Sequence, residues 1–232
     1  MKTRPIGLLN VSIVGLGCNN FGGRLAGYEE SERVIHAALD AGINFFDTAD
    51  IYGNTKSEEY LGRALKDRRG EAIIATKFGN KIDDERKGAA PDYVKRAAED
   101  SLRRLGVDVI DLYQLHRPDP DTPIADTIGA LQQLVAEGKV REIGCSNFSV
   151  EQLREAEAAA GSGPRFVSVQ NYYNLIASEP EKPVLEECAR TETAYLPFFP
   201  LAMGLFTGKY RLGQPRPQTS RMQGKAVEEF LT

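Results

Sequence analysis

Hydrophobic residues along the chain form two alternating kinds of segment. Short runs that are almost continuously apolar predict buried strands, and longer stretches with apolar residues three and four positions apart predict amphipathic helices. The strands are predicted at residues 11–17, 44–47, 72–77, 109–115, 140–145, 167–170 and 194–199. The helices are predicted at residues 32–41, 57–65, 91–105, 124–137, 150–160 and 182–191. One helix is marked at both ends, because Pro91 stands in its first turn and Gly106 follows its last.

Seven strands that are separated by helical segments predict a parallel sheet with right-handed crossover connections. An open, doubly wound sheet and a closed barrel both fit this alternation. The barrel is favoured because the units are regularly spaced and because no GxGxxG fingerprint follows the first strand. We therefore expect an α/β chain that folds as a single (β/α)8 TIM-type barrel domain over residues 1–232.

The stretch after residue 199 is short for such a barrel. Residues 200–209 predict a loop, and residues 221–232 predict the start of a helix, so no eighth strand is visible. A barrel of this kind takes about 250 residues. We therefore expect the barrel to be incomplete at the C-terminus, with open edges on its first and seventh strands that favour self-association. A fragment, a natural truncation and an engineered piece are all compatible with this sequence.

Composition narrows the classes of partner. The chain carries 29 basic and 33 acidic residues without a basic block, which argues against nucleic acid and against an anionic membrane surface. No apolar run is long enough to cross a bilayer. The three cysteines, Cys18, Cys145 and Cys188, lie far apart, and there are only two histidines. We therefore expect no metal site and a cytoplasmic protein with reduced thiols.

Polar residues fall at the carboxyl ends of the predicted strands. In chain order they are Asp47, Lys77, His116, Ser146, Asn147 and Gln170. In a (β/α) barrel the carboxyl ends of all strands meet on one face, which is where active sites lie. We therefore expect these side chains to share one site.

The residue types in this set suggest acid–base chemistry. A lysine at the end of a buried strand needs a carboxylate partner, and Asp47 on the neighbouring strand is the candidate for Lys77. An ammonium group favours the phenolate of a nearby tyrosine, so the pKa of Tyr52 is predicted to fall below its usual value of about 10. Such a tyrosine is a general acid for a carbonyl oxygen, and His116 can donate a second hydrogen bond to that oxygen.

Each of these residues taken alone also fits an ordinary structural role. Lys77 fits a surface position, Tyr52 fits loop packing, and Asp47 or His116 fits a turn cap. The Ser–Asn pair at residues 146–147 fits an N-cap before the following helix. Only the set as a whole points to a site.

Several local sequences together resemble the aldo-keto reductase family. They are FDTADIYG at 46–53, ATK at 75–77, DLYQLH at 111–116, GKVREIGCSNF at 138–148 and PLAMGLFTGK at 200–209. The resemblance extends over residues 11–210 in the family's order. It implies the (β/α)8 barrel and NADP(H) as the cofactor.

The resemblance also implies a role for each site residue. Tyr52 is then the proton donor, Lys77 and Asp47 tune it, and His116 orients the substrate carbonyl. The nicotinamide carboxamide is then held by Ser146, Asn147 and Gln170. The cofactor pyrophosphate is then covered by Phe199, Pro200, Leu201, Gly204, Leu205, Gly208 and Lys209. Phe199 departs from the tyrosine or serine of many relatives, which removes one polar contact near the cofactor.

The leading functional prediction is an NADP(H)-dependent oxidoreductase that acts on a small carbonyl compound. It would reduce an aldehyde or ketone, or oxidise the corresponding alcohol or sugar, by hydride transfer. The alternative is a catalytically weak or inactive barrel that senses the cofactor or binds a partner. A third alternative, a phosphate-binding lyase or isomerase barrel, would not need the residues that hold a carboxamide. We expect Asn19, Asn20 and Phe21 to line the substrate pocket.

Overall fold

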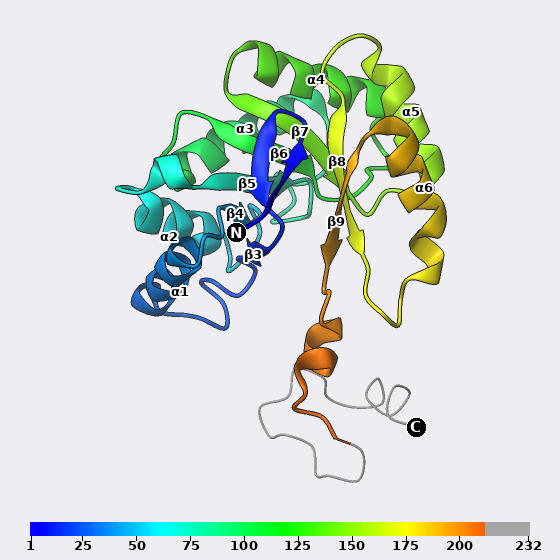
Figure 1. The fold of residues 1–232 in the computed structure, drawn as a ribbon. Helices are drawn as coiled ribbons and strands as arrows, with labels where there is room; N and C mark the ends of the chain where they lie inside the picture. The colour runs from blue at the N-terminus through cyan, green and yellow to red at the C-terminus, as the bar shows by residue number, and fades with distance from the viewer. Residues whose placement is uncertain (212–232) are drawn as a thin grey trace.

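Seven parallel strands form one continuous sheet in the computed structural model, which describes residues 1–211 (Figure 1). In order across the sheet they are β3 (Gly15–Gly17), β4 (Phe45–Asp47), β5 (Ile73–Phe78), β6 (Ile110–Leu115), β7 (Val140–Ser146), β8 (Phe166–Tyr172) and β9 (Ala194–Phe198). The sheet curls as part of a barrel, so the predicted α/β barrel with seven strands is confirmed. Within residues 1–211 no eighth strand joins β3 to β9, which are the two edges of the sheet.

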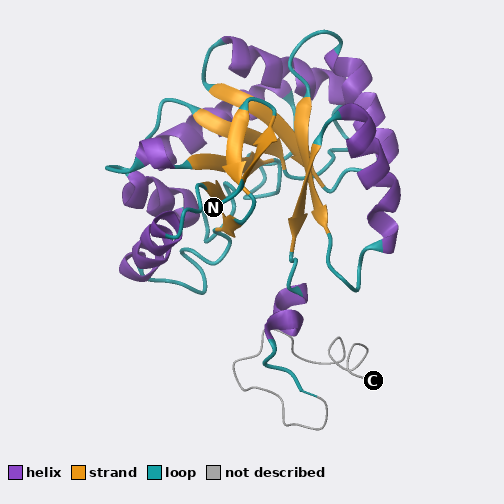
Figure 2. Ribbon diagram, in the orientation of Figure 1, coloured by secondary structure: helices purple, strands orange, loops and turns teal. Residues whose placement is uncertain are grey.

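Helices connect the strands and cover the outer face of the curled sheet (Figure 2). They are α1 (Tyr28–Asp40), α2 (Lys56–Leu65), α3 (Pro91–Leu105), α4 (Ile124–Ala136), α5 (Val150–Ala160) and α6 (Lys182–Thr191). The clearest boundaries have local causes. Gly106 ends α3 in a left-handed conformation with a φ of 64°, and Ser149 begins α5 with a capping box. The predicted bounds of α3, α5 and α6 are confirmed.

The prediction of one strand over residues 11–17 is wrong. The chain first forms an antiparallel hairpin of β1 (Thr3–Ile6) and β2 (Leu9–Ser12), and only then enters β3. The break has a polar cause, because the Ser12 hydroxyl donates to the carbonyl oxygen of Val14 at 2.7 Å and turns the chain. Ile13 and Val14 are consequently exposed, although their apolar character made the run look continuous.

The hairpin covers the inner side of the sheet near its amino ends. Ile6, Leu9 and Val11 pack there in one buried cluster with Phe45, Ala75 and Leu112. At the hairpin turn, the backbone N–H of Leu8 donates to the Glu142 carboxylate of β7 at 2.6 Å. The hairpin therefore covers the interior near the amino ends of the strands and does not reach their carboxyl ends.

Strand periodicity decides which side chains enter that interior. Successive side chains of a strand point to opposite faces of the sheet. Along β5, Ile74 and Phe78 pack outward against the helices, whereas Ala75 belongs to the inner cluster. Lys77 follows the parity of Ala75 and points into the barrel, and Thr76 points toward the helices.

Two sequence predictions concern other regions. The helix start predicted at 221–232 lies outside the described residues. Among the helices that the structure describes, none is long and apolar enough to cross a membrane.

Candidate active site

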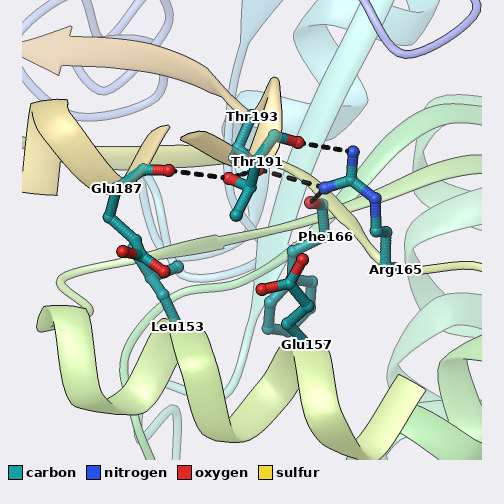
Figure 3. Close-up of a pocket in the computed structure, with 7 residues that line it drawn as sticks. All are labelled: Leu153, Glu157, Arg165, Phe166, Glu187, Thr191 and Thr193. Carbon is teal, nitrogen blue, oxygen red and sulfur yellow. Dashed lines mark hydrogen bonds between the residues drawn. The ribbon is translucent and has the colours of Figure 1, made fainter. Parts of the chain in front are cut away.

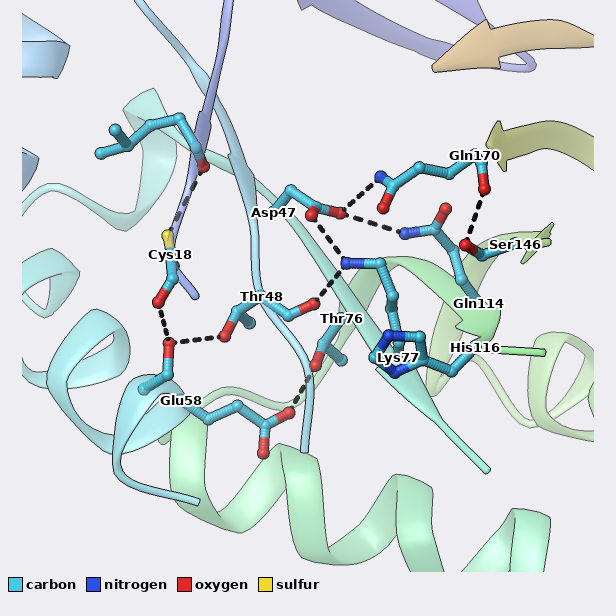
Figure 4. Close-up of polar contacts among 12 residues, drawn as sticks. Cys18, Asp47, Thr48, Glu58, Thr76, Lys77, Gln114, His116, Ser146 and Gln170 are labelled. Atoms are coloured by element: carbon cyan, nitrogen blue, oxygen red, sulfur yellow. Dashed lines mark hydrogen bonds and ion pairs between the residues drawn. The ribbon is translucent and has the colours of Figure 1, made fainter. Parts of the chain in front are cut away.

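The carboxyl ends of five neighbouring strands bring the predicted polar residues together (Figure 4). The strand register sets Lys77 of β5 opposite Gln114 of β6, and Ser146 of β7 opposite Gln170 of β8. Asp47 ends β4 beside them. Side chains that are far apart in the sequence therefore meet inside the curled sheet.

Lys77 is the most deeply buried charge of the site. Its side chain is fully buried, and its Nζ atom donates to Asp47 Oδ2 at 2.6 Å and to the carbonyl oxygen of Thr48 at 2.9 Å. Burial by itself lowers the pKa of Lys77, but the Asp47 carboxylate and the Tyr52 phenol outweigh burial and raise it. The ammonium group therefore stays charged inside the barrel.

Asp47 is held by amide donors on its other oxygen. Gln170 Nε2 donates to Asp47 Oδ1 at 3.0 Å, and Gln114 Nε2 donates to the same atom at 3.3 Å. Gln114 was not among the predicted site residues. Its signal was a polar residue at an inward-facing position of a buried strand, but the apolar neighbours Tyr113 and Leu115 gave no sign of which face points inward.

Tyr52 lies over this pair. The Lys77 Nζ atom is 5.2 Å from the centre of the Tyr52 ring, and the same ring meets His116 edge to face at 5.7 Å between centroids. The predicted fall in the pKa of Tyr52 is wrong. Burial raises that pKa by more than the Lys77 ammonium lowers it, and the Asp47 carboxylate raises it further. Tyr52 is therefore a neutral phenol at neutral pH, with a proton available.

His116 is also kept uncharged. Burial lowers its pKa to about 3, helped by the positive charges of Lys77 and Arg117. Its backbone carbonyl accepts a hydrogen bond from Asn147 Nδ2 at 2.9 Å, which links it to the next strand. The neutral imidazole carries one N–H that can donate to an oxygen.

The three residues predicted to hold a carboxamide are brought together. The Ser146 hydroxyl donates to the Gln170 carbonyl oxygen at 2.6 Å, and the Asn147 backbone N–H donates to the same oxygen at 3.1 Å. One hydroxyl and two side-chain amides offer both donors and acceptors, as a carboxamide requires. Buried Gln114 Oε1 and His116 Nδ1 nearby have no hydrogen-bond partner within residues 1–211. The hydroxyl and amide groups that a carboxamide needs are therefore gathered here, with Ser146 Oγ, Asn147 Nδ2 and Gln170 Nε2 donating to protein oxygens.

The segment predicted to cover the pyrophosphate lies apart from these residues. It continues beyond the carboxyl end of β9 and away from the sheet, through the short 3-10 segment η3 (Ala202–Thr207) (Figure 1). This segment contains Gly204 and Leu205 and is followed by Gly208 and Lys209, and Phe199, Pro200 and Leu201 precede it. Phe199, Ala202 and Met203 have φ values of 52°, 45° and 53°, a left-handed conformation that is strained for such residues.

The loop after β3 only partly matches its prediction. Phe21 is 2% exposed and belongs to the core between the sheet and the helices, so it does not line a pocket. Asn19 is exposed and Asn20 is half-buried. Phe21 is an apolar side chain next to two polar ones, and it is buried in the core because burial of an aromatic ring is favourable.

A second polar cluster lies directly behind Lys77, between the sheet and the helices. Glu58 of α2 is fully buried, and it accepts from Thr76 Oγ1 at 2.5 Å and from Arg104 Nε at 2.6 Å. Asp50 is 1% exposed, and neither of its carboxylate oxygens has a partner in the described part of the chain. Burial and the nearby Glu58 charge raise the pKa of Asp50 to about 7, although Arg104 opposes this.

A cavity between α5, α6 and the start of β8 lies at the opposite end of the sheet (Figure 3). Arg165 donates there to the Thr191 carbonyl oxygen at 2.7 Å and to Thr193 Oγ1 at 3.2 Å, and Glu187 pairs with two arginines. These polar groups satisfy one another and cap the end of α6. Residues 1–211 contain no group of three or more His, Cys, Asp or Glu that could hold a metal ion.

Known proteins with similar sequences identify the family of this chain. A sequence model described as the aldo/keto reductase family matches residues 13–231. The chain belongs to the aldo-keto reductase family. It is 38% identical over 221 residues to the aldo-keto reductase str7 of Strobilurus tenacellus, which covers 91% of this chain and 64% of that relative. It is 35% identical over 229 residues to the aldo-keto reductase yakc [NADP(+)] of Schizosaccharomyces pombe, covering 94% and 66%.

Solved aldo-keto reductase structures share the fold. A glycerol dehydrogenase from Gluconobacter oxydans has a TM-score of 0.84 and 35% identity, with 99% of this chain and 74% of that chain covered. An aldo-keto reductase from Klebsiella pneumoniae in complex with NADPH has a TM-score of 0.76 and 29% identity, covering 84% and 66%. The chain thus spans 64% and 66% of the length of the two curated relatives.

Proposed function

We propose that this protein is an NADP(H)-dependent oxidoreductase that transfers a hydride between the cofactor and a small carbonyl compound. The observation that carries the proposal is the buried Lys77–Asp47 pair, with the neutral Tyr52 and His116 side chains in contact above it. The relative from S. pombe is named with NADP(+), and the K. pneumoniae structure contains NADPH, which supports the choice of cofactor.

The four residues divide the work of protonating a carbonyl oxygen. Bound NADPH supplies the hydride that reaches the carbonyl carbon. The neutral phenol of Tyr52 donates its proton to the oxygen, which gains negative charge at that moment. The Lys77 ammonium stabilises the resulting phenolate, and Asp47 keeps Lys77 charged and oriented. The His116 N–H donates a hydrogen bond to the same oxygen. In the oxidative direction the Tyr52 phenolate accepts the proton of the alcohol, while Lys77, Asp47 and His116 keep the same contacts.

The cofactor is proposed to bind through two groups of residues. Ser146, Asn147 and Gln170 hold the nicotinamide carboxamide, for which their donors and acceptors fit. The segment of Phe199, Pro200, Leu201, Gly204, Leu205, Gly208 and Lys209 covers the pyrophosphate after moving toward the strand ends. Lys209 supplies the positive charge that a pyrophosphate requires.

Substitution of Tyr52 by phenylalanine tests the proposal. Tyr52→Phe removes the proton donor and leaves the ring packed against His116, so turnover of a generic aldehyde is expected to fall by about 10²–10⁴-fold. NADPH binding, followed by cofactor fluorescence, is expected to persist in the variant. A well-folded parent protein that binds neither NADPH nor NADH would contradict the proposal.

A second candidate function is cofactor sensing or partner binding without turnover. It is favoured by the position of η3 and its neighbours, which lie away from the other site residues (Figure 1). NADPH binding by the parent with no turnover of any aldehyde, ketone or alcohol would select this candidate.

A further inference from the structure

Asn171, the residue after Gln170 on β8, is 4% exposed, and its side-chain amide is fully engaged. Its Oδ1 atom accepts from the Phe148 backbone N–H at 3.2 Å, and its Nδ2 atom donates to the Phe148 carbonyl oxygen at 2.9 Å. Nδ2 also donates to Glu181 Oε2 at 3.0 Å. One side chain therefore fixes the peptide planes on both sides of Phe148.

The backbone at this point needs such support. Asn147 has a φ of 62°, in the left-handed region, where asparagine is tolerated but strained. Phe148 lies between the end of β7 and the cap of α5 at Ser149, so strand and helix hydrogen bonds do not serve it. Asn171 supplies both a donor and an acceptor there. A flip of either peptide plane would break one of these bonds and leave buried polar groups unpaired.

Glu181 orients Asn171 in turn. The same Oε2 atom of Glu181 accepts from the hydroxyl of Tyr195 on β9 at 2.9 Å. Burial raises the pKa of Tyr195, and the hydrogen bond to Glu181 raises it further, so Tyr195 stays a donor. With two donors, the carboxylate favours the amide orientation that presents Oδ1 of Asn171 to the Phe148 N–H.

We propose that Asn171, oriented by Glu181, is a positioning residue that sets the direction of the Asn147 side chain and so the shape of the carboxamide-binding set. The inference rests on the proposed function, in which Ser146, Asn147 and Gln170 hold the nicotinamide. Asn171 does not itself reach the cofactor. It acts through the two peptide planes that follow Asn147.

Asn171→Asp tests the proposal with almost no change of shape. The variant replaces the donor with a carboxylate oxygen that faces the Phe148 carbonyl and the Glu181 carboxylate, which is repulsive. Asn44→Asp is a matched control, because Asn44 Oδ1 accepts from Ser12 N–H and its Nδ2 donates to the Asn10 carbonyl oxygen at the other end of the barrel.

Two measurements are made on each variant. Without ligand, NMR hydrogen exchange of the Phe148 amide is expected to speed up by about tenfold or more in N171D, together with a shift of the Asn147 side-chain amide. NADPH affinity is expected to fall by about tenfold in N171D. N44D is expected to change neither quantity. The double variant N171D/E181Q restores a donor beside residue 171 and is expected to recover part of the affinity.

Hydrogen exchange at Phe148 and an Asn147 side-chain amide signal that are both unchanged in N171D would overturn the proposal. If the parent binds NADPH, an N171D variant that binds it with the same affinity would overturn the proposal as well. If the parent does not bind NADPH, the proposed function fails, while the exchange measurement still decides the positioning role. If N171D does not fold, Asn171→Ala removes the same three hydrogen bonds without adding a charge, and the same outcomes apply.

Discussion

At the scale of single residues, burial acts on four ionisable side chains around the candidate active site in different ways. Lys77 keeps its charge because Asp47 and Tyr52 outweigh the effect of burial on its pKa. Tyr52 and His116 are kept neutral, the phenol by a raised pKa and the imidazole by a lowered one. Asp50, behind the strand, has a pKa raised to about 7. Inside the barrel the Lys77–Asp47 ion pair therefore lies beside two neutral side chains, Tyr52 and His116.

The raised pKa of Asp50 predicts a pH dependence of stability. The folded state binds a proton below about pH 7, whereas the unfolded chain binds it only below pH 3.8. The contribution of Asp50 to the free energy of unfolding is therefore fully present below pH 3.8. It is lost as the pH rises from 3.8 through 7, by up to about 1.4 kcal/mol per pH unit. Asp50→Asn is expected to lack this loss in urea unfolding between pH 4 and 8.

His116 contributes with the opposite sign in part of this range. Its lowered pKa means that stability is lost as the pH falls from 6.5 toward 3. Because both proteins contain His116, the difference between parent and Asp50→Asn isolates the aspartate. The exposed substitution Asp121→Asn is the control. Parallel stability curves for parent and Asp50→Asn would contradict the prediction.

The positions of the site residues could be predicted because the rule for strand ends needs only strand boundaries. Asp47, Lys77 and Gln170 follow from it. The pKa of Tyr52 could not be predicted, since its burial depends on segments that are distant in the sequence. Gln114 could not be distinguished from its apolar neighbours without knowing which face of β6 points inward.

At the scale of elements, Glu58 connects three of them behind Lys77. It lies on α2, accepts from Thr76 of β5, and pairs with Arg104 of α3. Removing a donor from a buried carboxylate costs more than the hydrogen bond contributes, because the oxygen is left unpaired. This contact therefore fixes the helices on the strand that carries the catalytic lysine proposed above.

Thr76→Val is expected to lower the free energy of unfolding by about 1–3 kcal/mol, because Glu58 Oε1 loses its hydroxyl donor. Thr76→Ser keeps the hydroxyl and is expected to lose less. Urea unfolding of the three proteins under the same buffer gives the comparison. Equal losses in the valine and serine variants would show that the hydroxyl has no such role.

The elements themselves were predictable where local chemistry marks their ends. Pro91 and Gly106 bound α3 at the residues that the sequence predicts. The cap of α5 is Ser149, whereas the sequence offered the Ser–Asn pair at residues 146–147 for that role. The hairpin of β1 and β2 was missed, because its docking depends on Phe45, Ala75 and Leu112 from later strands. The apolar Ile13 and Val14 then joined its second strand to β3 in the pattern.

At the scale of the whole molecule, β3 and β9 present unpaired strand edges within residues 1–211. Such edges offer backbone donors and acceptors to another chain. Pro197 weakens this tendency on β9, because it has no N–H to donate. Self-association through the edges of β3 and β9 thus remains a prediction.

Sedimentation over a range of protein concentrations is expected to show species larger than the monomer. Gly17→Lys places a charge on edge strand β3, where a Cβ at residue 17 meets nothing within 4 Å, and such charges oppose edge pairing, so this variant is expected to shift the distribution toward monomer. Leu8→Lys changes an 88% exposed residue of the hairpin turn and is the control. A purely monomeric parent at all concentrations would contradict the prediction.

The amino-terminal hairpin has a consequence for synthesis on the ribosome. Leu8 docks on Glu142, which is 134 positions later in the chain. At translation rates of about 5–20 residues per second, the hairpin turn waits on the order of ten seconds for its partner on β7. Ile6, Leu9 and Val11 can be covered in stages within that time, because their partners Phe45, Ala75 and Leu112 are synthesised before Glu142. Nascent chains halted between residues 112 and 142 should therefore bury part of these side chains while the Leu8 amide still lacks its Glu142 partner.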